Sequence, residues 1–309
     1  FRHEDWNKAR IECYGNSIRT WVNGIPCARL WDDADPSGFI ALQVHQVGSK
    51  EDEAKTVCWR DIRICTKQVA DYLTPQDIID EYNAIENTIS PWEKANGWTL
   101  LWDGETTKGW RGAYSYEFPS KGWVIEDGVL TVNPSGEPEG GGDIITEELL
   151  HHYIVKIDFL LSEGADGGIK YFIDPDYGPY GGRATGCEYQ LIDDGGVPEE
   201  KFGWRGNHTL ASLFDLIPAD PEKTYHRGDW NTAMIVVNAN RVEHWLNDRR
   251  VLYYERNNPM WEALVSHSKY RDFPRFGNLK DGYFLLQDEH CRVSFKNIKF
   301  KELRKYPVQ

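Results

Sequence analysis

Hydrophobic and polar residues alternate along most of the chain after Gly97, in short runs that are separated by turn residues. Period-two alternation is typical of strands with one buried face, and Asp127-Gly128 and Asn247-Asp248 suit tight hairpin turns. Ten segments fit this pattern: WTLLWDG, GWVIEDGVLTV, YIVKIDFLL, GGIKYFI, CEYQLID, TAMIVVN, RVEHWLND, RVLYYE, GYFLLQD and VSFKNIKF. Short strands at regular spacing predict an all-β fold, either a two-sheet sandwich or a jelly roll.

The same pattern occurs twice. DWNKARIECYGNSIRTWVNG, which starts at Asp5, aligns with DWNTAMIVVNANRVEHWLND, which starts at Asp229, and SGFIALQVHQ and VCWRDIRI likewise align with DGYFLLQDEH and VSFKNIKF. In both VCWRDIRI and VSFKNIKF the alternation of apolar and polar residues shifts by one position, at Asp61 and at Asn297. Such a shift predicts a β-bulge in each copy. The sequence therefore predicts a duplicated domain.

The repeat predicts three parts. Residues 1–66 are the C-terminal part of a first jelly-roll domain, 67–95 a helical linker, and 96–309 a complete second jelly-roll domain. Four or five strands alone would leave a bare inner face and bare edges. We therefore expect the partner strands of the first domain to come from an upstream N-terminal segment or from a complementary chain.

The linker contains one clear helix signal. Thr74, Pro75 and Asp77 provide an N-cap hydroxyl, a first-turn proline and an acid at the helix start. A single apolar stripe follows, made of Ile78, Ile79, Tyr82 and Ile85. This pattern predicts a short linker helix packed between the domains.

Composition narrows the classes of partner. The 309 residues carry a net charge of −14, which argues against nucleic-acid and anionic-membrane partners, because those need basic surfaces. No apolar run is long enough to span a membrane. The six cysteines form no Cys-x-x-Cys pair and are interpreted as free, buried thiols rather than a disulfide framework.

The motifs GWTLLWDGETTKGWRG, GWVIEDGVLTV, GGIKYF, CEYQLID, WNTAMIVVN, VEHWLND and LLQD…VSFKNIKF carry a family resemblance. In this order they resemble the family once catalogued as DUF1080 and now described as 3-keto-disaccharide hydrolase. The resemblance spans Asn96 to Leu303 and implies a concanavalin-like jelly roll that acts on a sugar. It also implies a bacterial protein that is periplasmic or extracellular, with a lipoprotein as one alternative.

Period-two alternation places Glu188 and Gln190 on one face of their strand, where a carboxylate and an amide suit sugar binding. A solvated outer face is the alternative. His244 occupies a position where the family often has histidine, and Lys170 one where it usually has a basic residue. These matches make Glu188 and His244 candidate catalytic residues and Lys170 a candidate substrate ligand.

The strand LLQDEH adds Gln287 and Asp288 as candidate substrate ligands. The family pattern there is closer to Leu-Gln-Asp-His-Gly, so Glu289 stands where the family has histidine. The first copy has Thr20 in place of His244 and Val44 in place of Asp288. These differences predict that the second domain carries the activity.

Two long loops, 174–186 and 192–219, are candidates for lining the site. They supply Arg183, Trp204 and His208 for stacking on a sugar and hydrogen bonding to it. The same loops hold four aspartates that could bind Ca²⁺ or another divalent metal, although the EF-hand pattern is incomplete: Asp174, Asp176, Asp193 and Asp194.

A 3-keto sugar offers a specific reaction. Its ketone acidifies the C2–H bond, so a base removes that proton, the C1 substituent leaves by elimination, and water then adds. This route needs a base, an acid and donors for the enolate oxygen. Glu188 and His244 are the candidates for base and acid in either order, with Lys170, Gln190 and Gln287 as donors. The alternatives are a non-catalytic glycan-binding module, and an ordinary glycosidase with a second carboxylate near Glu188.

Overall fold

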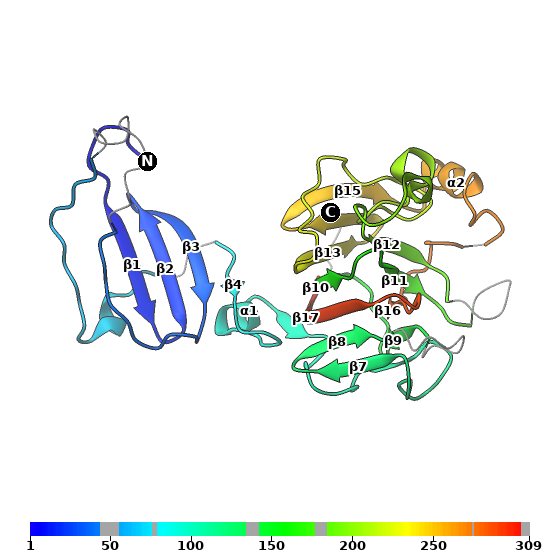
Figure 1. Ribbon diagram of the computed structural model, residues 1–309, viewed down its shortest axis with the longest axis horizontal. Helices are drawn as coiled ribbons and strands as arrows, with labels where there is room; N and C mark the ends of the chain where they lie inside the picture. The colour runs from blue at the N-terminus through cyan, green and yellow to red at the C-terminus, as the bar shows by residue number, and fades with distance from the viewer. Residues whose placement is uncertain (44–55, 76–78, 134–141, 177–183, 274, 304–309) are drawn as a thin grey trace, which may run out of the picture. The chain divides into compact units, whose positions relative to one another are not determined.

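The computed structural model describes residues 1–43, 56–75, 79–133, 142–176, 184–273 and 275–303. The chain divides into two compact units, Phe1–Ile85 and Glu86–Gln309, each with its own strands (Figure 1). None of the helices among these residues is long and apolar enough to cross a membrane. The fold is nearly all β, as predicted.

The first unit is a sheet of four strands among the described residues. An antiparallel meander of β1 (Ala9–Tyr14), β2 (Ser17–Val22) and β3 (Ile25–Trp31) is extended by β4 (Tyr82–Asn83), which runs parallel to β3. A 3-10 turn, η1, spans Val69–Tyr72. The segment 56–65, which aligns with the last strand of the second unit, forms no strand here.

The second unit contains two antiparallel sheets, and one core cluster takes residues from both of them. In the described residues the larger sheet has the order β15-β14-β13-β10-β17-β8-β7, with β5 also paired to β17, and the smaller sheet has the order β12-β11-β16-β9-β6 (Figure 1). The larger sheet comprises β5 (Trp98–Leu100), β7 (Trp123–Glu126), β8 (Val129–Val132), β10 (Tyr153–Leu161), β13 (Asn231–Asn238), β14 (Arg241–Leu246), β15 (Arg249–Glu255) and β17 (Val293–Glu302). The smaller sheet comprises β6 (Trp110–Gly112), β9 (Ile144–Thr146), β11 (Asp166–Ile173), β12 (Cys187–Ile192) and β16 (Tyr283–Leu286).

The helical elements of the second unit are short. They are α1 (Pro91–Ala95), α2 (Pro259–Ser266) and the 3-10 turns η2 (Glu199–Phe202) and η3 (Trp204–Gly206). Ser90 and Glu93 form a capping box at the start of α1, and the Asn258 side chain accepts a hydrogen bond from the backbone of Trp261 at the start of α2. Trp261 is buried and stacks on Tyr254, so α2 is fixed against the larger sheet.

Strand alternation explains the core. In β10 every second residue from Tyr153 to Leu161 is buried. All six residues of β12 are buried, because its outer edge is bonded to the loop 211–214: Gln190 exchanges backbone hydrogen bonds with that loop, and Phe214 donates to the carbonyl of Glu188. This loop removes an exposed strand edge and encloses the polar side of β12.

The bulge predicted at Asn297 is confirmed. The pairing of β10 with β17 shifts register between Lys156 and Asp158, and Asn297 has a φ of 51°. Its side chain donates to Asp158 and accepts from the backbone of Asn87, which hold the bulge in place. Asp61 has a similar φ of 55°, but its segment has no strand partner in the part of the chain that the structure describes.

The meander β1–β3 repeats the geometry of β13–β15. Ala9 faces Val22 as Ala233 faces Leu246, and the register shift after Thr20 recurs after His244. The hairpin contacts also recur: the Asn23 amide donates to Asn7, two residues before β1, and the Asn247 amide donates to Asn231, the first residue of β13. These shared registers agree with the aligned sequences, while duplication of the whole domain remains a prediction.

The two meanders differ in burial on the face that forms the core of the second unit. Ile235 and Val237 are 0% exposed, whereas the aligned Ile11 is 67% exposed and Cys13 is also exposed. All six cysteines are free, but among them only Cys187 is classed as buried. The prediction of buried thiols therefore fails in the first unit, where no described strand covers this face.

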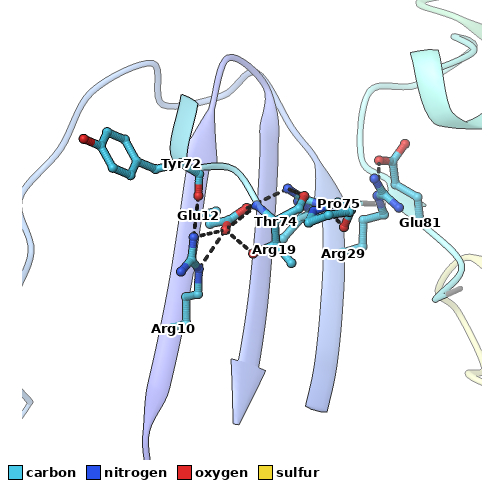
Figure 2. A network of polar contacts seen from close by, with 8 residues as sticks. All are labelled: Arg10, Glu12, Arg19, Arg29, Tyr72, Thr74, Pro75 and Glu81. Atoms are coloured by element: carbon cyan, nitrogen blue, oxygen red, sulfur yellow. Dashed lines mark hydrogen bonds and ion pairs between the residues drawn. The ribbon is translucent and has the colours of Figure 1, made fainter. Parts of the chain in front are cut away.

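On the other face of the first sheet, the side chains of β1, β2 and β3 contact Tyr72, Thr74, Pro75 and Glu81 (Figure 2). Thr74 donates its backbone and hydroxyl hydrogens to the buried carboxylate of Glu12, and Arg19 bonds both this carboxylate and the Thr74 carbonyl. Arg29 pairs with Glu81 at 3.2 Å. A pocket of about 450 Å³ lies beside these groups.

The helix predicted to begin at Thr74 is not found in the described residues, and Asp77 and Ile78 of that prediction lie outside them. The Thr74 hydroxyl bonds Glu12, and residues 79–85 form no helix, with Tyr82 paired to Leu30. A hydroxyl can satisfy a strand carboxylate as well as a helix N-terminus, so the local signal did not decide between them. The helical elements of segment 67–95 that the structure describes are η1 and α1.

Candidate functional site

The register of the smaller sheet brings four predicted site residues onto one face. Lys170 of β11 faces Glu188 of β12, and Gly168 faces Gln190. On the other side of β11, the backbone of Gln287 donates to the Gly168 carbonyl at 3.0 Å. The residues between them, such as Ile169 and Tyr189, point into the core. We call Lys170, Glu188, Gln190 and Gln287 the polar face.

The polar face is largely shielded from water. Glu188 is 7% exposed, Lys170 8%, Gln190 2% and Gln287 7%. The prediction that Glu188 and Gln190 share a face is therefore confirmed, and the alternative of a solvated outer face is wrong.

Lys170 and Glu188 form the charged centre of this face. The Lys170 Nζ atom lies 3.9 Å from Glu188 Oε2. Burial raises the pKa of the Glu188 carboxyl, while the positive charges of Lys170 and Lys269 oppose the rise. A carboxyl group in this environment exchanges a proton more readily near neutral pH than an exposed glutamate does.

Asp143 is a second carboxylate in this region, and the sequence interpretation missed it. It accepts a hydrogen bond from the backbone of Asp288 at 2.9 Å. Burial raises its pKa, and the charge of Lys170 partly offsets that rise. Asp143 immediately precedes the three-residue strand β9, which is too short to give a period-two signal. Nothing local in the sequence marks it as a neighbour of Lys170.

Asp288 supports the backbone instead of facing the polar face. Its carboxylate accepts from the backbone of Gly142 at 3.2 Å and of His290 at 3.0 Å. These bonds connect the end of β16 with the residues that carry Asp143. Asp288 is thus placed to position Asp143, whereas it was predicted to bind substrate.

His208 lies in a second polar group. Its Nε2 atom is 3.0 Å from Asp215 Oδ1, and its ring stacks on Phe214. Asp215 also accepts from the backbone of Lys269, whose Nζ atom lies 3.9 Å from the centre of the Phe214 ring. Burial lowers the pKa of Lys269, and the charge of Glu188 opposes that effect. Lys269 therefore links this group electrostatically to the polar face.

The other two loop residues predicted to bind substrate are Trp204 and Arg183. Trp204 is 69% exposed, and Arg205 lies over its ring. Arg183 lies outside the described residues.

His244 does not belong to the polar face. It is 0% exposed, its Nδ1 atom lies 2.9 Å from the Ala211 carbonyl, and its Nε2 atom lies 2.6 Å from the Tyr171 hydroxyl. A carbonyl only accepts, so Nδ1 carries the hydrogen and Nε2 accepts from Tyr171. Burial lowers the pKa of His244 from 6.5 to about 4. The imidazole is therefore a neutral core group with both nitrogens satisfied, and this environment does not support the catalytic role predicted for His244.

The aspartates considered for a metal have other partners. Asp193 binds Arg227 through Nε at 2.9 Å, and Asp194 binds Lys223 at 3.1 Å. Asp174 accepts from the backbone of Asp176. Within the described ranges no group of three or more His, Cys, Asp or Glu side chains could hold a metal ion.

The comparisons with known proteins agree with this fold. A family model described as the 3-keto-alpha-glucoside-1,2-lyase-like domain matches residues 1–65 and 97–301. The chain belongs to this family. It is 32% identical over 237 residues to the 3-keto-disaccharide hydrolase of Bacteroides thetaiotaomicron, which covers 68% of this chain and 79% of the relative.

A solved structure extends the comparison to the fold. The crystal structure of a "putative glycosyl hydrolase" from Parabacteroides distasonis is 28% identical, with a TM-score of 0.62, and covers 71% of this chain and 100% of its own. The family resemblance and the all-β sandwich expected from the sequence are thus confirmed. Membership supports an enzyme of the glycoside-acting hydrolase class.

Proposed function

We propose that the Glu86–Gln309 unit cleaves 3-keto-glycosides by proton abstraction at C2, elimination of the C1 substituent and addition of water. The proposal is supported by family membership and by one structural observation. This observation is the buried pair of Lys170 and Glu188, 3.9 Å apart, on a face that also carries two amides.

The reaction balances as a hydrolysis. A base takes the C2 proton. The electron pair of the broken C2–H bond moves toward the C3 ketone and forms an enolate. The enolate then re-forms the ketone as the C1–oxygen bond breaks, and an acid protonates the departing oxygen. Water adds its oxygen to C1 and a proton returns to C2, so the products are a 3-keto sugar and an alcohol.

The polar face supplies groups for each step. The Lys170 ammonium is suited to stabilise negative charge on the enolate oxygen, because a positive charge held in a water-poor site interacts strongly. Glu188 and Asp143 are the carboxyl groups whose pKa values Lys170 influences. We propose that these two carboxyls share the roles of base and acid, in an order that the static geometry leaves open.

A binding module alone would not need this arrangement. Burying a lysine and a glutamate beyond hydrogen-bond distance costs desolvation energy that a neutral amide face avoids. Charged groups that are held apart in a shielded site are more typical of catalysis than of passive recognition. This comparison favours the enzyme over the glycan-binding alternative.

The second unit is the proposed location of activity. The aligned part of the first unit corresponds to β13–β17, so the described residues of Phe1–Ile85 include no counterpart of β11 and β12. They therefore offer no equivalent of Lys170 or Glu188.

The test compares 3-keto-trehalose with trehalose, and a 3-keto-glucoside with its unoxidised parent. We expect sugar release from the oxidised substrates alone. In D2O the product should contain deuterium at C2 beyond the exchange measured in an enzyme-free control. Equal cleavage of the unoxidised sugars would favour an ordinary glycosidase, and tight binding with no cleavage would favour a glycan-binding module.

A further inference from the structure

Gly168 lies at the centre of the polar face. It is flanked by Gln190, which is its direct partner in β12, and by Gln287, whose backbone donates to it. A Cβ atom on Gly168 would lie 2.6 Å from Glu188 Oε1 and 2.8 Å from Gln287 Oε1. The absence of a side chain therefore lets these two oxygens converge over the strand.

Neighbouring carboxylates fix the orientation of both amides. Gln190 donates through Nε2 to Asp166 Oδ1 at 2.8 Å, and Gln287 donates through Nε2 to Glu289 Oε1. Only the NH₂ end of an amide can donate to a carboxylate. The carbonyl oxygens of Gln190 and Gln287 must therefore point the other way.

These two amide oxygens have no hydrogen-bond partner among the residues that the structure describes. Both are buried, and their residues are 2% and 7% exposed. An amide oxygen is an acceptor at every pH, and leaving it unsatisfied in a buried site costs free energy. The face therefore presents acceptors that need a donor from a bound molecule.

We infer that Gly168, Gln190 and Gln287 form a subsite for a ring hydroxyl next to the ketone of the sugar. This inference rests on the proposed function and specifies how the substrate lies. A ketone oxygen can only accept hydrogen bonds, and the oxygens beside Gly168 are acceptors as well, so the ketone would be repelled there. We therefore place the ketone oxygen at the Lys170 ammonium, which is a donor. A hydroxyl group has one hydrogen to donate, so it supplies the donor that one of the two amide oxygens needs.

The two adjacent glycines of β11 provide a matched pair of variants. Gly168→Ala places a methyl group among the acceptors, and the atoms it meets are ends of flexible side chains, so the fold should tolerate it. In Gly167→Ala the new Cβ would lie 3.5 Å from Val293 Cγ2, which is an ordinary packing contact. We expect Gly168→Ala to weaken binding of a 3-keto-glucoside at least tenfold, while Gly167→Ala binds as the wild type does.

Calorimetric binding separates this inference from the proposed function. A wild-type chain that binds the keto-glucoside without cleaving it contradicts only the proposed function, and the glycine comparison still stands. Equal affinity of wild type and Gly168→Ala overturns the subsite. A wild type that neither binds nor cleaves the sugar overturns both.

A substrate series tests the hydrogen bond itself. The 2-deoxy and 4-deoxy forms of a 3-keto-glucoside each lack one hydroxyl next to the ketone. We expect one of them to bind wild type on the order of 10–100-fold more weakly, because it leaves a buried acceptor unpaired. Gln287→Met should lose a similar factor for the full sugar and little more for that deoxy form. The deoxy sugar and the Gln287→Met substitution each cause a loss of affinity. If the loss for the variant with the deoxy sugar equals the product of these two losses, Gln287 does not bind the hydroxyl and the inference fails.

Discussion

The Lys170 ammonium and the Glu188 carboxylate lie 3.9 Å apart on adjacent strands, both nearly excluded from water. The distance is too long for a direct hydrogen bond but short enough for strong electrostatic coupling. It leaves the lysine hydrogens available to a substrate oxygen. This relationship is the basis of the first prediction.

Substitutions at this pair should reduce turnover with little change in stability. Glu188→Gln removes a proton-transfer group, so we expect the turnover of a 3-keto-glycoside to fall ~10²–10⁴-fold. Lys170→Met removes a donor to the enolate oxygen, for which a loss of ~10²–10³-fold is typical. Steady-state kinetics and thermal unfolding measure both effects.

Lys156→Met is the matched control for Lys170→Met, because Lys156 lies on β10 beside the exposed Asp248, 3.4 Å away. It should keep wild-type turnover. Full activity in the Glu188 variant would place the chemistry elsewhere.

His244→Thr should lower stability rather than alter the chemical step. The substitution leaves the Ala211 carbonyl without its partner, removes one of the two partners of the Tyr171 hydroxyl, which also contacts the Tyr254 hydroxyl, and creates a cavity. Each unsatisfied buried group costs about 1–3 kcal/mol. Urea unfolding should show a large loss, while turnover per folded molecule at low temperature remains close to wild type. A stable variant with low turnover would restore His244 as a catalytic residue.

His244 should also make stability depend on pH. Its pKa is about 4 in the folded protein and 6.5 when exposed, so between these values the unfolded chain holds a proton that the folded chain lacks. The free energy of unfolding should therefore rise with pH across this window, by up to about 1.4 kcal/mol per pH unit from this residue. The His244→Gln variant should lack this contribution. An unchanged slope in that variant would contradict the burial of a neutral imidazole.

Acid should release the segment around Thr74 in the first unit. Burial raises the pKa of Glu12, but hydrogen bonds from Thr74 and Arg10 and the charge of Arg19 outweigh it, so the net pKa is below 4.5. The ionised carboxylate thus stabilises the folded state above pH 4.5, and this contribution is lost as the pH falls through the lowered value.

Hydrogen exchange at the Thr74 amide tests this dependence, because that amide donates to Glu12. After correction for intrinsic rates, we expect its protection to fall as the pH drops through the lowered pKa of Glu12. Glu12→Gln should reduce the protection already at pH 7, whereas Asp33→Asn, at an exposed position, should leave it unchanged. Constant protection in the Glu12 variant would show that the carboxylate does not hold the segment.

The exposed face of the first unit should bind hydrophobic probes. Ile11 on this face is 67% exposed and aligns with the fully buried Ile235, and Ile62 and Ile64, which lie outside the strands of this unit, are 67% and 68% exposed. We predict that additional strands complete the sandwich over this face. The full chain should therefore bind an apolar fluorescent dye more strongly than a fragment of residues 86–309. The fragment should retain the proposed cleavage of 3-keto-glycosides. Equal dye binding by both would contradict this prediction.

Period-two alternation and the repeat determined much of the fold from sequence alone. Glu188 and Gln190 share a face because side chains two residues apart on a strand must do so, and the phase slip at Asn297 located a real bulge. Leu246 shares the face of His244 and is fully buried, so the sequence already contained the signal for a core histidine. The family likeness outweighed that signal in the initial interpretation.

Other features were decided by tertiary structure. Asp143 comes close to Lys170 through pairings of β9, β16 and β11, and strand order and register over more than a hundred residues are not local properties. Thr74 could satisfy either a helix end or Glu12, and only the neighbouring sheet determined which partner it took. Local alternation fixes which side chains point together, whereas long-range pairing fixes which strands they meet and which groups become buried.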